Sequence, residues 1–87
     1  MWYVYALQSE KNKRLYIGFT SNLKRRLREH NEGVGGVYTK KNGPFKMIFY
    51  EAFNDKQDAA RDERFFKTGY GREVLKDKLK DTLKNLK

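Results

Sequence analysis

Cysteine is absent from the 87 residues of this chain, and histidine and proline occur once each. Without thiols the chain has no disulfide, no thiolate zinc site and no cysteine nucleophile. A single histidine also excludes a histidine-rich metal site, so a bound ion would need carboxylate oxygens and water, the ligands that magnesium and manganese prefer. The sequence also lacks an apolar run near the ~18 residues of a membrane span, and it begins without a signal-peptide pattern. We therefore expect a cytoplasmic protein that does not bind membranes.

Positive charge is what the sequence has in excess. Twenty Lys and Arg against eleven Asp and Glu give a formal charge of +9. A surplus of this size favours a polyanionic partner such as nucleic acid, and it is also found in generically basic soluble proteins. The 38% of hydrophobic residues, 15% of aromatic residues and modest length suit one packed core, so we expect a single domain over residues 1–87.

Three segments are typical of β-strands. Residues 2–7 and 15–17 are rich in aromatic and β-branched side chains, and the polar stretch 8–13 between them predicts an antiparallel hairpin. Such a hairpin would bring Tyr5 and Tyr16 near one another on one face, where ordinary cross-strand packing is the simpler explanation of the pair.

The third strand is predicted over residues 45–53. Alternation places Phe45, Met47 and Phe49 on one face and apolar side chains on the other. Because both faces carry apolar residues, we predict that this is the central strand, covered on both sides.

A helix is predicted after Gly18, with Ser21 or Asn22 as its cap. Leu23 and Leu27 mark its inward face, and Arg26 and His30 fall on the same face, whereas Arg25 and Arg28 point away. An inward arginine either extends past the edge of the core or binds an anion. A lone histidine on such a face is more often structural than functional.

The next helix begins at Asn54-Asp55, with Asp58 in a capping-box-like position. Its inward face carries Glu63 among Ala59, Ala60 and Phe66. A carboxylate among apolar groups is costly unless it is paired or binds a cation. Two explanations stay open, a cation ligand and an intrahelical ion pair with Lys67.

Two further segments complete the chain. The glycine-rich stretch 31–36 ends the first helix, and the following loop carries Tyr38, Lys40 and Lys41, which suit contact with phosphates and bases or form a solvated basic loop. Residues 68–71 break the second helix, and residues 72–87 predict another, with Leu75, Leu79, Leu83 and Leu86 on its core side.

Five of these elements in order resemble the GIY-YIG nuclease superfamily, in particular its short stand-alone bacterial members. They are Tyr3-Val4-Tyr5, Tyr16-Ile17-Gly18, Arg26, His30 and Glu63. Tyr3 stands where the family usually has glycine, and no asparagine follows Glu63 at the family's distance. The resemblance implies an α+β fold, with a small three-stranded antiparallel sheet flanked by about three helices.

The resemblance also implies hydrolysis of phosphodiester bonds with one Mg²⁺ or Mn²⁺ ion. Glu63 would be the protein ligand of the ion, Arg26 would neutralise charge on the phosphate, and Tyr5 and Tyr16, assisted by His30, would position or deprotonate the attacking water. Neither tyrosine is assigned as the base, because a phenol with a pKa near ~10 is rarely ionised at neutral pH without nearby positive charge.

The sequence therefore predicts a metal-dependent DNA endonuclease that is structure-selective or weakly sequence-specific, since no added domain is present to read sequence. DNA is expected ahead of RNA, with Tyr38, Lys40, Lys41 and Arg25 as binding residues. The alternative is a module of the same fold that binds nucleic acid with little or no cleavage. A protein-interaction domain would explain the core but neither Arg26 nor Glu63, and a protein partner is left open by the sequence.

Overall fold

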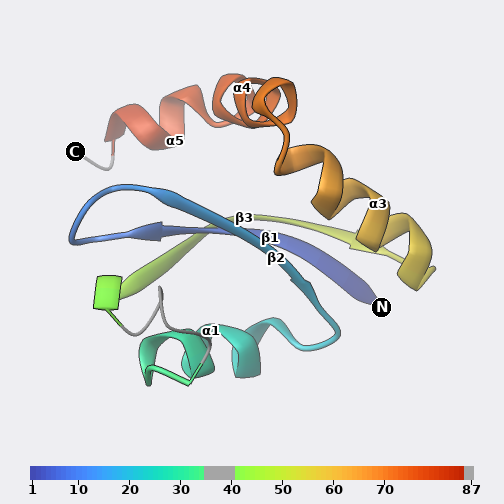
Figure 1. Cartoon of the computed structure of the whole chain (residues 1–87), viewed down its shortest axis with the longest axis horizontal. Coiled ribbons are helices and arrows are strands. Elements are labelled where there is room, and N and C mark those ends of the chain that lie inside the picture. The colour runs from blue at the N-terminus through green and yellow to red at the C-terminus, as the bar shows by residue number, and fades with distance from the viewer. Residues whose placement is uncertain (35–40, 86–87) are drawn as a thin grey trace.

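A computed structural model gives the structure of the protein and describes residues 1–34 and 41–85. Figure 1 shows one sheet with α1 on one face and α3, α4 and α5 on the other. The fold class is α+β, as predicted. None of the helices in the described part is long and apolar enough to cross a membrane. The elements are β1 (Trp2–Ser9), β2 (Leu15–Thr20), α1 (Leu23–Asn31), β3 (Phe45–Phe53), α3 (Lys56–Phe66), α4 (Gly69–Lys78) and α5 (Lys80–Asn85).

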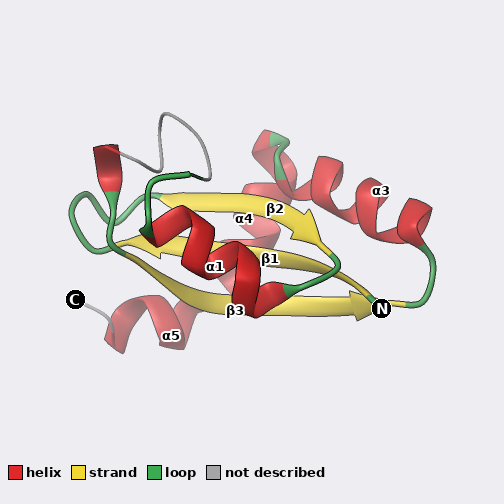
Figure 2. Cartoon of the chain, turned by 90° about the horizontal axis from the view of Figure 1, so that it is seen from below, coloured by secondary structure: helices red, strands yellow, loops and turns green. Residues whose placement is uncertain are grey.

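The strand order is β2-β1-β3, and both pairings are antiparallel. The predicted hairpin of β1 and β2 is confirmed, with Tyr5 opposite Gly18 and Leu7 opposite Tyr16. The prediction that the third strand is central was wrong. β1 occupies the centre, and every residue from Val4 to Ser9 is buried because helices cover both faces of that strand. Figure 2 shows α1 lying across the sheet.

A β-bulge explains why β3 has apolar side chains on both faces. Its register shifts between Ala6 and Leu7 of β1, so that Leu7 pairs with Met47 and Ala6 with Phe49. A bulge adds one residue to a strand and reverses the alternation beyond it. Phe45 and Met47 therefore share a face, as predicted, and pack on the side of α1. Phe49 was wrongly placed with them and packs on the other side against Phe66.

The sheet separates two hydrophobic clusters. The larger one lies beneath α3, α4 and α5, and the smaller one lies beneath α1. Val4, Ala6, Ala59, Phe66, Leu75 and Leu79 form the larger cluster. Tyr5, Leu7 and Phe45 form the smaller cluster, closed by Leu23 and Leu27. The predicted inward faces of the helices are thereby confirmed for the described residues, while Leu86 lies outside them.

Side-chain caps set where the helices begin. Asn22 caps α1 by accepting from the backbone N–H of Arg25, and Asp55 caps α3 by accepting from that of Gln57. Asp58 pairs with Arg61 through contact of Oδ1 with Nη1 at 3.2 Å, in place of the predicted capping-box role. The structure describes four helices instead of about three, because the single helix predicted over 72–87 is divided at Leu79 into α4 and α5.

The break between α3 and α4 is shorter than predicted. Thr68 caps α4 by accepting from the N–H of Gly71, so Gly69, Tyr70 and Gly71 are already helical. Gly71 is buried against the end of α3, where a Cβ atom would contact the carbonyl oxygen of Phe65 and lie 2.6 Å from its carbonyl carbon. The absence of a side chain at Gly71 therefore permits the close packing of α4 on α3.

We predict that Gly71→Ala lowers the free energy of unfolding by about 1–3 kcal/mol, because a methyl group there would force backbone atoms apart. Gly69→Ala is the matched control, since its Cβ would meet no atom within 4 Å. It should leave stability unchanged or raise it by up to about 1 kcal/mol through better helix propensity. Denaturant melts compare the two, and equal stability of both variants would contradict the proposed contact.

Candidate active site

The candidate site lies at the free edge of β2. Tyr5 is buried in the central strand and is only 3% exposed, yet its phenol reaches across β2 over Gly18. A Cβ atom at Gly18 would contact the Tyr5 hydroxyl and lie 2.6 Å from the ring carbon Cζ. The second glycine of the signature therefore leaves room for the Tyr5 phenol between the central strand and the edge.

His30 meets the Tyr5 phenol from α1. The Tyr5 hydroxyl lies 3.0 Å from Nε2 of His30, and the two rings pack edge to face at 6.0 Å. Among the described residues, Nδ1 of His30 is buried and has no hydrogen-bond partner. The imidazole is therefore held in place by its contact with Tyr5 and by packing against Phe45.

Arg26 adds the third member of this group. A side-chain hydrogen bond joins it to Tyr5, and its Nη1 contacts Oε1 of Glu29 at 3.1 Å. A guanidinium only donates, so the phenol oxygen accepts from Arg26. The Tyr5 O–H can then donate to Nε2 of His30 in the tautomer that carries the imidazole proton on Nδ1.

The pKa shifts of Tyr5 and His30 agree with a hydrogen bond that the phenol donates to the imidazole. Burial raises the pKa of Tyr5; the hydrogen bond and charge of Arg26 oppose that rise, while the negative charges of Glu63 and Glu29 add to it. Burial, and then the charge of Arg26, lowers the pKa of His30, and Glu29 opposes this change. At neutral pH the proton therefore stays on the phenol, and His30 is a neutral acceptor.

Glu63 approaches the same group from the opposite helix layer. Its charge influences the pKa of Tyr5, although α3 lies on the other face of the sheet from α1. The Glu63 side chain is 17% exposed, and its Oε2 contacts Nζ of Lys67 at 3.2 Å. Both open explanations thus have a physical basis: the carboxylate is held near Tyr5, and a cation already sits beside it.

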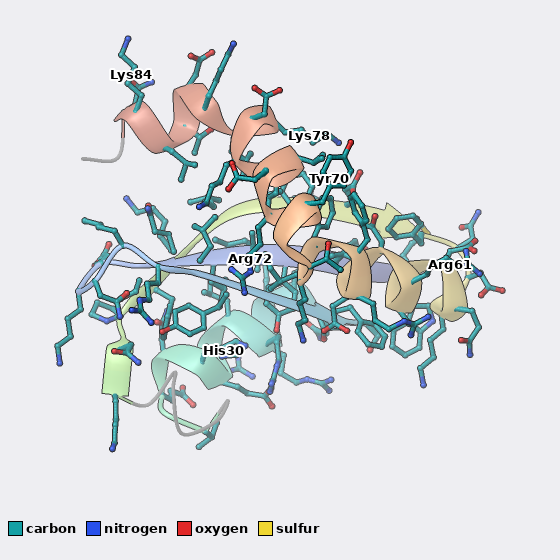
Figure 3. All side chains as sticks on the ribbon, turned by 45° about the horizontal axis from the view of Figure 1, so that its top comes forward. His30, Arg61, Tyr70, Arg72, Lys78 and Lys84 are labelled. Carbon is teal, nitrogen blue, oxygen red and sulfur yellow. The ribbon has the colours of Figure 1, made fainter. Side chains whose placement is uncertain are left out.

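A groove of about 870 Å³ opens next to this group. Leu15, Tyr16 and Ile17 line it together, and because successive strand residues point to opposite faces, the groove must run along the edge of β2. Among the described residues its lining contains five cationic side chains and no carboxylate; the cations are Lys13, Arg14, Lys67, Arg72 and Lys76. Figure 3 shows Arg72 on the side of the fold where α4 overlies the strands.

Tyr16 lies in the lining of this groove together with His30. Its ring packs edge to face against Phe45, with 5.1 Å between the centroids. It sits diagonally across the hairpin from Tyr5, since Tyr5 pairs with Gly18 two residues further along β2. Sequence alternation correctly put both tyrosines on one face of the sheet.

The residues predicted to bind nucleic acid lie elsewhere or cannot be placed. Arg25 is exposed on α1, and neither it nor Lys41 lines the groove. The carbonyl of Lys41 accepts from Nζ of Lys11. Tyr38 and Lys40 lie outside the described residues.

Sequence reasoning missed two features of this region. Glu29 contacts Arg26 from three residues along the same helix, and that spacing could have identified it. The groove cations were not identified as a group, because they come from the β1–β2 turn, the end of α3 and two positions along α4. Only the tertiary fold brings such separated segments to one sheet edge.

Of the carboxylates near Tyr5, Glu63 is the one that could hold a hard divalent ion. Within the described ranges no cluster of three or more His, Cys, Asp or Glu side chains could hold a metal. Magnesium is commonly bound by one or two carboxylates together with water and substrate phosphate, so Glu63 alone fits an ion that binds with its substrate.

A second carboxyl pair lies on the other sheet edge. Burial, followed by the hydrogen bond to Glu51 and the charge of Glu51, raises the pKa of Asp62 to about 7, against the opposing charge of Lys78. Nζ of Lys78 lies 3.8 Å from Oε2 of Glu51. Glu51 belongs to β3, at the opposite edge of the sheet from β2, so this pair is separate from the Tyr5 group.

The fold is a three-stranded antiparallel sheet whose central tyrosine bonds to an arginine, contacts a histidine and feels the charge of a helix glutamate; the family that matches this chain is part of a nuclease superfamily. The chain belongs to the GIY-YIG family: the family described as the GIY-YIG catalytic domain matches residues 1–78.

The chain is also similar to bacterial UPF0213 proteins. A UPF0213 protein of Streptococcus agalactiae is 46% identical over 65 residues, which cover 75% of this chain and 73% of the relative. One from Clostridium perfringens is 42% identical over 67 residues, covering 77% of this chain and 71% of the relative. The solution NMR structure of a UPF0213 protein from Bacillus halodurans matches with a TM-score of 0.53 and 35% identity, covering 86% of this chain and 82% of that one.

We predict that Gly18→Ala displaces the Tyr5 phenol and breaks its hydrogen bond to His30. Because the chain has one histidine, imidazole nitrogen-15 NMR reports on this bond without ambiguity. The parent protein should show a neutral ring protonated at Nδ1, and the variant should lose that preference. Gly69→Ala again serves as the control and should leave the signals unchanged. Identical imidazole spectra for Gly18→Ala and the parent would contradict the close contact.

Proposed function

We propose that this protein is a divalent-metal-dependent endonuclease that hydrolyses phosphodiester bonds in DNA, with structure-selective or weakly sequence-specific action. One observation carries the proposal: Arg26, Tyr5 and His30 are joined by hydrogen bonds, the charge of Glu63 acts on Tyr5, and His30 also lines a cationic groove. Membership of a nuclease family supports the same reaction class.

Tyr5 and His30 supply a path for the proton of the attacking water. The neutral Nε2 of His30 accepts the Tyr5 proton as the phenol oxygen takes one from water. The resulting hydroxide attacks phosphorus, the bond from phosphorus to the leaving oxygen breaks with its electron pair on that oxygen, and the oxygen takes a proton from solvent water. Since burial raises the pKa of Tyr5, the phenol needs His30 as its acceptor and Arg26 as its counter-charge.

Arg26 stabilises the negative charge that develops on the phosphate. A guanidinium has five N–H donors, so one that is oriented by Tyr5 and Glu29 can also donate to phosphate oxygens. Its side chain is 33% exposed, which gives a substrate access to it. Preorganised donors of this kind contribute to catalysis because they need no reorientation during the reaction.

Glu63 would hold the divalent ion, Mg²⁺ or Mn²⁺, in place of the Lys67 ammonium that now contacts it. When bound, such an ion supplies positive charge to the scissile phosphate and lowers the pKa of water that it coordinates. Lys67 is 51% exposed, so its flexible side chain can leave the carboxylate and turn toward the groove that it also lines.

The groove favours weak sequence selectivity. Its charged lining consists of lysines and arginines, which contact phosphates and so position a nucleic acid without reading its bases. DNA is the proposed substrate, with RNA as the comparison in the same assay. Tyr38, Lys40, Lys41 and Arg25 remain proposed accessory contacts; of these, Arg25 and Lys41 do not line the groove.

We predict that Arg26→Ala and Glu63→Gln each lower the rate of magnesium-dependent cleavage by about 100-fold or more, because each removes one charge placed at the reacting phosphate. Nicking of supercoiled plasmid, with magnesium or with chelator, measures the rate. Circular dichroism should show that both variants stay folded, since the ion pairs they lose are partly exposed and stabilise little.

Arg25→Ala is the matched control for Arg26→Ala. It removes the same charge from the adjacent position, on the exposed side of α1, and should change the rate by less than about threefold. Equal losses from both arginines would show that net positive charge, and not a placed guanidinium, supports cleavage. Binding of DNA without cleavage by the parent protein would favour a binding module instead.

A further inference from the structure

The lining of the cationic groove contains apolar and aromatic side chains as well as the cations that attract phosphate. Its floor is the edge strand β2, with Leu15, Tyr16 and Ile17, and no described strand pairs with the outer edge of β2. Cations stand around this floor, two in the β1–β2 turn and three on the side of α3 and α4. The groove therefore joins apolar and aromatic surface, strand backbone and positive charge.

Single-stranded nucleic acid matches this composition, and a duplex does not. In a duplex the base faces are stacked inside, so phosphates and base edges meet a protein surface and an apolar floor has no partner. In a single strand the base faces are exposed and stack on aromatic side chains, while the backbone follows a positively charged groove. Unpaired groups of an edge strand add hydrogen bonds of either polarity.

We propose that the groove along β2 binds a single-stranded segment of nucleic acid and leads it to the Tyr5 group. The bases stack on Tyr16 and contact the apolar strand edge beside it, and the phosphates face the cations. This inference rests on the proposed nuclease function and deepens it, because it makes a strand that has left its duplex the preferred substrate. Tyr16 and His30 lie in the same lining, so a bound strand would pass the proposed reacting groups.

The existing ion pairs of the groove cations leave them available to phosphate. Lys76 contacts Glu73 at 3.8 Å, and both side chains are more than half exposed. Exposed pairs of this kind stabilise by less than about 1 kcal/mol, so a phosphate can replace them. Among the described residues Arg72 forms no ion pair, which makes it the side chain of choice for mutation.

The test uses the full chain with chelator present, so that binding is measured without cleavage. Fluorescence anisotropy compares the double variant Arg72→Gln/Lys76→Gln with the control Lys80→Gln/Lys84→Gln, which removes the same charge from exposed positions on α5. The probes are a labelled single-stranded oligonucleotide and a blunt duplex of the same length. Each variant is titrated at several salt concentrations.

We expect the parent to bind the single strand about tenfold more tightly than the duplex, as stacking on the floor implies. The groove variant should lose about tenfold in affinity for the single strand, and its slope of log affinity against log salt should fall by about 1.4, at ~0.7 per lost phosphate contact. The α5 control should change affinity by less than about twofold.

Equal losses in the groove and α5 variants would overturn the inference, and so would tighter binding of the duplex. The outcome is independent of cleavage. If only the groove variant loses affinity for the single strand, and the parent never cuts DNA, the single-strand groove is supported and the proposed nuclease function is contradicted. If the parent cuts DNA but binds the duplex more tightly than the single strand, the nuclease function is supported and the single-strand groove is contradicted.

Discussion

The close contact of Tyr5 with Gly18 is the constraint on which the rest of the site depends. Tyr5 is fixed in the buried central strand, and its hydroxyl can reach the sheet edge because the residue opposite it on β2 has no side chain. At that edge the two helix layers come near one another. His30 and Arg26 arrive from α1 and Glu63 from α3, so one missing methyl group allows groups from both faces to share a site.

Charge then sets the state of that site. Tyr5 and His30 share one proton, and burial keeps it on the phenol in the absence of ligand. The same buried phenol feels the positive charge of Arg26 and the negative charge of Glu63. A cation on Glu63 and a phosphate on Arg26 would each alter this balance. Lys67 already contacts this carboxylate, with 3.2 Å between its Nζ and Oε2 of Glu63.

Local sequence patterns predicted most of the elements and the inward faces of the helices, including the contrast between Arg26 and Arg25. They failed where contacts between distant segments determine the structure. The bulge opposite Ala6 and Leu7 reverses the alternation of β3, and strict period-two reasoning had no means of locating it. The groove was also not predicted, because its cations belong to separate segments that only the fold brings to β2. Family resemblance supplied the grouping of Tyr5 with Glu63, which no local pattern contains.

Binding of manganese to uniformly nitrogen-15-labelled protein tests most directly whether Glu63 and the Tyr5 group form one metal-dependent site. Substoichiometric Mn²⁺ broadens amide signals near the ion. We expect broadening at Gly18 on β2 and at Glu63, and we expect the effect at Gly18 to be lost in Glu63→Gln. Broadening centred on Glu51 of β3, or broadening at Gly18 that persists in Glu63→Gln, would contradict such a shared site.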